Sequence, residues 1–121
     1  MNTNIDSTPL RGEIWWADLP GPKASEPGYS RPVLIVQADA FNQSRIQTVL
    51  AIVLTSNLHL ANAPGNVGLS TRKTGLPKES VANVSQIVTL DRSFLRDRQG
   101  KLDETAMTRV ADGLKLVLGL I

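Results

Sequence analysis

Residues 25–37 read SEPGYSRPVLIVQ, a polar loop that runs directly into an apolar strand. Residues 33–36 are all aliphatic, which predicts a strand covered on both faces, by the protein core or by a second subunit. Pro32 fixes its own φ and pushes the preceding residue toward an extended conformation. Arg31 is therefore expected where loop and strand meet, with its guanidinium group rooted on rigid backbone.

Further segments with the composition of strands lie on both sides of this stretch. Residues 12–18 are aromatic and β-branched and close at Leu-Pro-Gly-Pro, and residues 49–54 are again continuously apolar. Residues 67–70 and 80–90 predict two more strands, so that we expect five or six in all. Residues 38–44 are compatible with a short helical turn.

The end of the chain changes to helical periodicity after Leu102, and Asp103 is placed to accept backbone N–H groups as an N-cap. Leu116 and Leu120 lie off the apolar stripe and would be exposed in a monomer. We predict a mainly β fold, a small antiparallel SH3-like barrel closed by a C-terminal α-helix, with residues 1–11 as a flexible extension and residues 12–121 as one domain. The predicted stripe comprises Met107, Val110, Ala111, Leu114, Val117, Leu118 and Ile121.

Composition excludes several classes of site. The chain has 121 residues and no cysteine, so disulfides and thiolate metal sites are absent. The first ten residues are polar and about 18 consecutive apolar residues occur nowhere, which predicts a cytoplasmic protein without a signal peptide or membrane span. No Walker loop, HExxH motif or dinucleotide fingerprint is present. His59 stands alone in a polar loop, where a solvated and a catalytic histidine both remain open.

The charge balance is slightly basic, with 13 Lys and Arg against 11 Asp and Glu. Two groups of basic residues would suit a phosphate backbone, although solvated loops give the same pattern. The groups are Arg72, Lys73 and Lys78, and Arg92, Arg96, Arg98 and Lys101.

Arg31 and Glu26 are the side chains around the opening stretch that suggest chemistry. A planar guanidinium group matches a phosphate better than the point charge of lysine does, and it stays protonated at physiological pH. Glu26 can approach the same place as an acceptor or a base. A surface ion pair between the two is the alternative, and the residues alone leave both open.

Four motifs in order carry a family resemblance: GEIWWADL at 12–19, SEPGYSRPVLIVQ at 25–37, AIVLTSN at 51–57 and SQIVTLD at 85–91. With these motifs the chain resembles the MazF/PemK family of toxin endoribonucleases. The resemblance implies a homodimeric SH3-like barrel that cleaves single-stranded RNA, typically messenger RNA, without a metal or other cofactor. It also implies a MazE-like antitoxin as partner.

The resemblance transfers roles by position. Arg31 matches the family's catalytic arginine, Thr55 the threonine that binds the scissile phosphate, and Glu26 an acid implicated in some members; Ser56 adjoins Thr55 and can support it. RNA supplies its own nucleophile, the 2′-hydroxyl, so an enzyme needs to orient it, remove its proton and stabilise the phosphoryl oxygens. The expected products are a 2′,3′-cyclic phosphate and a free 5′-hydroxyl.

Further residues are candidates for RNA binding. Two adjacent strand residues face opposite ways, so at least one of Trp15 and Trp16 is expected in the core, and Trp16 or Tyr29 would stack on a base. Gln86 can hydrogen-bond a base. The expected RNA-binding set is Ser56, Gln86, Trp16, Tyr29, Arg72 and Lys73.

Departures from the family pattern keep alternatives open. Pro27 replaces a usual glutamine and Ala24 a frequent glycine, while Ser85 and Val88 stand where charged residues are common. Two other readings are a gyrase-poisoning toxin similar to CcdB, and a catalytically silent member that binds only antitoxin or RNA. The C-terminal LVLGLI lacks the tryptophan usual in gyrase poisons, which disfavours the first.

Overall fold

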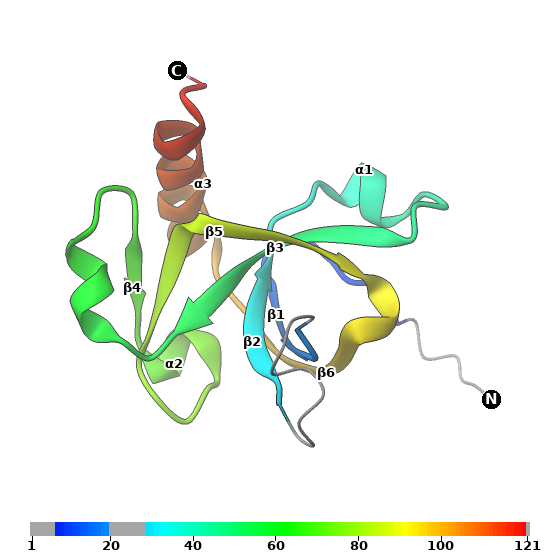
Figure 1. The fold of residues 1–121 in the computed structure, drawn as a ribbon, viewed down its shortest axis with the longest axis horizontal. Coiled ribbons are helices and arrows are strands. Elements are labelled where there is room, and N and C mark those ends of the chain that lie inside the picture. The colour runs from blue at the N-terminus through cyan, green and yellow to red at the C-terminus, as the bar shows by residue number, and fades with distance from the viewer. Residues whose placement is uncertain (1–6, 20–28, 121) are drawn as a thin grey trace.

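The computed structural model describes residues 7–19 and 29–120 of the chain. They form one six-stranded sheet in the order β4-β5-β3-β2-β1-β6, and all neighbours pair antiparallel. The sheet curls into a half-barrel with the C-terminal helix α3 on one side (Figure 1). The predicted fold class, a mainly antiparallel β structure with a C-terminal helix, is confirmed.

The strands follow the apolar segments closely, except at the last one. Six strands agree with the expected five or six, but the prediction did not locate β6, whose sequence showed only a group of basic residues. It is an edge strand whose backbone pairs with β1 while its residues are exposed or half-buried. The strands are β1 (Glu13–Ala17), β2 (Arg31–Ile35), β3 (Thr48–Thr55), β4 (Val67–Leu69), β5 (Ser80–Asp91) and β6 (Leu95–Lys101).

Short helical segments connect the strands. The expected turn near residue 40 is α1 (Asp39–Asn42), whereas α2 (Thr71–Thr74) and the 3₁₀ helices η2 (Leu58–Asn62) and η3 (Arg92–Phe94) were not predicted. One turn of helix has too few residues to show a 3.6-residue period, so these elements carry little sequence signal.

The central strands are buried on both faces, as their unbroken apolar runs predict. Alternate residues of β2 and β3 fall into two clusters. Leu34 and Ile52 pack with Ala106 and Val110 of the C-terminal helix α3 (Glu104–Leu118). The alternate residues Val33, Ile35, Ala51 and Val53 pack on the other face, inside the curl of the sheet.

α3 begins as predicted and ends differently. The Asp103 carboxylate accepts the Ala106 N–H at 2.8 Å, which confirms the N-cap. Leu116 and Leu120 are exposed, as expected. The expectation that Val117 and Leu118 belong to the buried stripe is wrong, because the last turn extends past the sheet and leaves them 42% and 54% exposed.

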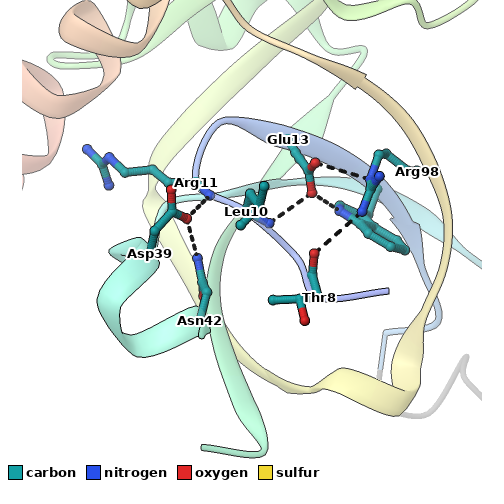
Figure 2. A network of polar contacts seen from close by, with 8 residues as sticks. Thr8, Leu10, Arg11, Glu13, Asp39, Asn42 and Arg98 are labelled. Atoms are coloured by element: carbon teal, nitrogen blue, oxygen red, sulfur yellow. Dashed lines mark hydrogen bonds and ion pairs between the residues drawn. The ribbon is translucent and has the colours of Figure 1, made fainter. Parts of the chain in front are cut away.

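A buried carboxylate fixes the start of β1 (Figure 2). Glu13 accepts hydrogen bonds from the Leu10 N–H at 2.8 Å and the Trp15 indole at 3.0 Å, and its other oxygen pairs with Arg98 of β6 at 3.1 Å. Residues 7–11, part of the expected extension, thus contact the sheet; residues 1–6 lie outside the described residues, and the boundary at residue 11 stays a prediction.

Asp39 anchors the same region from the side of α1 (Figure 2). It accepts the Arg11 N–H at 2.8 Å and the Asn42 amide at 3.0 Å. These bonds, the first above all, hold the pKa of the Asp39 carboxyl below its usual value. Within the described part of the chain, no helix has the length and apolar character that crossing a membrane requires.

Candidate active site

A cleft of about 410 Å³ opens at the end of the sheet where β2 begins and β3 ends. Its walls come from β1, β2, β3, β5 and the segment after α2. The lining residues are Trp16, Leu19, Tyr29, Arg31, Pro32, Val53, Leu54, Thr55, Ser56, Leu76, Pro77, Lys78, Ser80 and Gln86.

Arg31 and Thr55 meet at this end because their strands are antiparallel. Arg31 is the first residue of β2 and Thr55 is the last of β3. The two strands pair Val33 with Val53, and the same register continued two residues toward the cleft sets Arg31 opposite Thr55. Both side chains line the cleft, as the sequence predicts for a shared site.

Arg31 is exposed and stacks on a neighbour. Its guanidinium carbon lies 5.3 Å from the centroid of the Tyr29 ring. A cation over an aromatic face is held by the ring's quadrupole, which leaves the N–H groups at the guanidinium edge free to meet an anion. Tyr29 thus serves to orient Arg31 in addition to forming part of the wall.

Thr55 is half-buried with its hydroxyl already oriented. Its Oγ1 accepts the Asn57 N–H at 3.1 Å. Because this bond uses a lone pair of the oxygen, the hydroxyl hydrogen remains available to donate. Ser56 follows directly and is exposed on the same wall.

The two tryptophans divide between core and cleft, as alternation along a strand predicts. Trp15 is 6% exposed and packs inside the curl of the sheet. Trp16 is half-buried and lines the cleft, where its indole N–H donates to the Gln99 Oε1 at 2.9 Å. Trp16 is therefore the tryptophan with a face available to a ligand.

Gln86 reaches the cleft from a bulge in β5. Ile52 pairs with Ile87 and Leu54 with Ala82, so residues 83–86 stand opposite Val53 alone. The bulge is held by Asn66, whose Oδ1 accepts the Val84 N–H at 2.9 Å. Bulges re-aim side chains beside functional sites, and this one exposes Gln86 on the cleft wall.

The described walls of the cleft carry cations and no carboxylate. Arg31 and Lys78 are the charged residues among them, so the cleft favours an anion. Lys78 was predicted only as part of a basic group, and its place in the cleft depends on how the segment after α2 folds back, which local sequence does not reveal. Glu26, Pro27 and Ala24 lie outside the described residues.

Arg72 and Lys73 are not brought into this cleft. They line a separate hollow of about 640 Å³ with Lys101 and Asp103, and Lys73 pairs with Asp103 at 3.1 Å. The Ala106 N–H, and then Lys73, lower the pKa of the Asp103 carboxyl. A role of Arg72 and Lys73 in RNA binding stays a prediction.

Three further residues, His59, Ser85 and Val88, are not among those that line the cleft. His59 is exposed in η2. Ser85 is exposed on the β5 bulge, where its hydroxyl donates to Asn83 Oδ1 at 3.0 Å, and Val88 packs against the inner core. Residues 7–19 and 29–120 contain no group of three or more acidic or histidine side chains arranged to hold a metal ion.

The chain is similar to known proteins along most of its length. A family model described as PemK-like, MazF-like toxin of type II toxin-antitoxin system matches residues 10–118. The chain is 50% identical over 110 residues to Endoribonuclease MazF6 of Mycobacterium tuberculosis (strain CDC 1551 / Oshkosh), covering 91% of this chain and 96% of that protein. It is 33% identical over 111 residues to Endoribonuclease EndoA of Bacillus subtilis (strain 168), covering 92% and 95%.

A solved structure shares the fold. It is an endoribonuclease in complex with its cognate antitoxin from a mycobacterial species, with a TM-score of 0.75 and 27% identity, covering 93% of this chain and 97% of that one.

Proposed function

Because the chain belongs to the family of PemK-like, MazF-like toxins of type II toxin–antitoxin systems, we propose that it is a metal-independent endoribonuclease that cleaves single-stranded RNA, chiefly messenger RNA, at short sequences. The observation that carries the proposal is the meeting of Arg31 and Thr55 in a cleft whose described walls hold no carboxylate. Such a cleft suits a phosphodiester and supplies donors to its oxygens.

The proposed reaction is an internal displacement at phosphorus. The 2′-oxygen forms a bond to the phosphorus as the bond to the 5′-oxygen breaks, leaving a 2′,3′-cyclic phosphate and a 5′-hydroxyl. Arg31 holds the phosphoryl oxygens as charge grows on them, and Thr55 donates its hydroxyl to the same oxygens. The 2′-hydroxyl gives its proton to a base, for which Glu26 is the candidate, and the 5′-oxygen takes up a proton, for which Arg31 is the candidate donor.

The substrate must be unpaired. Reading a base edge and aligning the 2′-oxygen both require a nucleotide turned out of its stack. The cleft presents the face of Trp16, the ring of Tyr29 and the amide of Gln86 for this purpose, with Ser56 beside Thr55. Stacking on an aromatic ring contributes about 1–3 kcal/mol per base.

The family and the relatives support a proposal for the cellular setting. We propose a cytoplasmic homodimer whose activity a MazE-like antitoxin restrains by covering the RNA cleft. A solved mycobacterial relative is itself bound to its cognate antitoxin, which supports a partner of this kind.

The test is incubation of the purified protein with a single-stranded RNA in excess EDTA. Discrete fragments ending in 2′,3′-cyclic phosphate and 5′-hydroxyl are expected, and DNA of the same sequence should stay intact because it lacks the attacking oxygen. An RNA that stays whole, under conditions where the protein is folded, would show a silent member of the family. The gyrase-poisoning reading is not favoured, since the relatives above are named endoribonucleases.

A further inference from the structure

Gln99 joins two walls of the cleft without lining the cleft itself. Its Oε1 accepts the Trp16 indole N–H at 2.9 Å, and its Nε2 donates to the Gly75 carbonyl at 2.6 Å. A glutamine amide offers one acceptor and two donors on a single rigid plane, so both bonds can form together. The side chain therefore connects β1 to the end of α2.

A bulge in the edge strand turns Gln99 toward Trp16. β6 pairs Arg98 with Trp15 and Gly100 with Ile14, which leaves Gln99 as the extra residue between the two pairs. Arg98 stacks on Trp15, its guanidinium carbon 5.0 Å from the ring centroid. Successive strand residues face opposite ways, so Gln99 points to the other side, where Trp16 lies.

Gly75, the second hydrogen-bond partner of Gln99, lies at the start of the opposite wall of the cleft. Gly75 has φ +77°, a conformation that favours glycine, and it ends α2 with its N–H on the Thr71 carbonyl at 2.8 Å. The next three residues, Leu76, Pro77 and Lys78, all line the cleft. Their path therefore begins at the carbonyl that Gln99 holds.

The contact between α2 and β6 is close enough to need glycine. A Cβ built on Gly100 would lie 2.6 Å from the Thr74 carbonyl oxygen. The backbones of α2 and β6 thus touch directly beside Gln99, which brings the Gly75 carbonyl within reach of its side chain.

We propose that Gln99 is a positioning residue that sets the width of the cleft by holding the Trp16 indole and the segment 76–78 at a fixed separation. The part of this proposal that concerns RNA rests on the proposed function, whereas the part that concerns the geometry of the cleft does not. Since Gln99 touches no part of the reacting phosphate in this scheme, its loss should weaken substrate binding and leave the chemical step intact.

Three substitutions separate the two bonds. Q99E keeps an acceptor for Trp16 and sets a carboxylate against the Gly75 carbonyl, whereas Q99K keeps a donor for Gly75 and offers Trp16 no acceptor. Q99M removes both at similar size. Q43M is the matched control, because Gln43 is exposed after α1 and is not among the residues that line the cleft.

The first readout needs no RNA. The indole N–H resonance of Trp16, identified by its loss in W16F, should shift in Q99M and Q99K and exchange with solvent roughly three- to tenfold faster, the effect of one lost hydrogen bond. Q99E should retain most of the protection. An unchanged Trp16 resonance in Q99M would overturn the proposal.

The second readout is steady-state cleavage. All three variants should raise KM, Q99M by roughly three- to tenfold, with kcat within about twofold of the unmodified enzyme. A fall in kcat at constant KM would contradict a positioning role. A wild-type protein that cuts no RNA, but whose Trp16 resonance responds to Q99M, would refute the nuclease and support the bridge.

Discussion

Arg31 stands at the mouth of the cleft because of the proline that follows it. Pro32 lacks an N–H and fits the start of a strand, where it pairs with Trp16 of β1, and it keeps Arg31 extended. The stack on Tyr29 then orients a side chain whose root is already rigid. The position of this one charge thus follows from its neighbours in sequence.

The hydroxyl of Thr55 gives a prediction at the same scale. T55V keeps the branched shape of the side chain at the end of β3 and removes the donor, so cleavage should slow by roughly 100-fold. T55S keeps the hydroxyl and should stay much closer to the wild-type rate. Single-turnover rates of the two variants, with thermal melts as a folding control, check this. Equal rates in T55V and wild type would remove Thr55 from the mechanism.

Single residues were predictable where a local rule acts. Alternation along a strand separates Trp15 from Trp16, and the register of antiparallel strands brings Arg31 to Thr55. Lys78 and Gln99 follow no such rule. Their places depend on a bulge in β6 and on the left-handed turn at Gly75, which bring distant segments together.

At the scale of elements, α3 meets the loop before β4 at two glycines. A Cβ on Gly113 would clash with the Gly65 carbonyl oxygen and lie 3.1 Å from a methyl of Val84 in the β5 bulge. Alanine gains about 1 kcal/mol of helix propensity over glycine, but an overpacked contact of this kind costs more. The clash should therefore outweigh the propensity.

G113A should lower the free energy of unfolding by about 2 kcal/mol or more. G68A is the control, since nothing lies within 4 Å of a Cβ built on that strand residue. Urea denaturation measures both. A G113A protein as stable as G68A would mean that α3 can move away from the sheet without cost.

The cap of α3 gives a pH-dependent prediction. The pKa of Asp103 is lowered in the folded state, so its charge contributes stability above the unfolded pKa of about 3.9, and this contribution is lost as the pH falls through the lower folded value. D103A should melt lower than wild type at pH 7 because the cap is lost.

D103N separates the cap from the charge. Asparagine caps a helix about as well as aspartate, so this variant should keep the cap and lose part of the decline in Tm between pH 5 and pH 3. Melting curves across that range measure this. If the Tm values of wild type and D103N decline in parallel, the Asp103 charge does not contribute to the pH dependence.

Elements were predictable in proportion to their apolar content. β2, β3 and β5 carry aliphatic runs that only burial explains, and each was expected nearly as it lies. β6 has the sequence LRDRQGK, whose strand state comes from pairing with β1 rather than from any apolar period. The exposed end of α3 was mispredicted because periodicity continues beyond the surface that the helix covers.

The whole molecule leaves apolar residues on its surface. Phe41, Leu58 and Leu116 are each at least half exposed, together with much of the last turn of α3. We expect a homodimer, and light scattering at micromolar concentration should give twice the mass of one chain. A single-chain mass at that concentration would contradict the dimer while leaving the cleft of one chain unaffected.

Cleavage by the whole molecule depends on Arg31 acting at the phosphate. The most direct measurement is single-turnover cleavage of a single-stranded RNA in EDTA by wild type, R31K and R31A. Loss of the guanidinium group should slow R31A by roughly 100- to 1000-fold, with R31K between because lysine keeps the charge without the fork of donors, and all three should melt alike. An R31A protein that cuts the same RNA at the wild-type rate would show that Arg31 does not act at the phosphate.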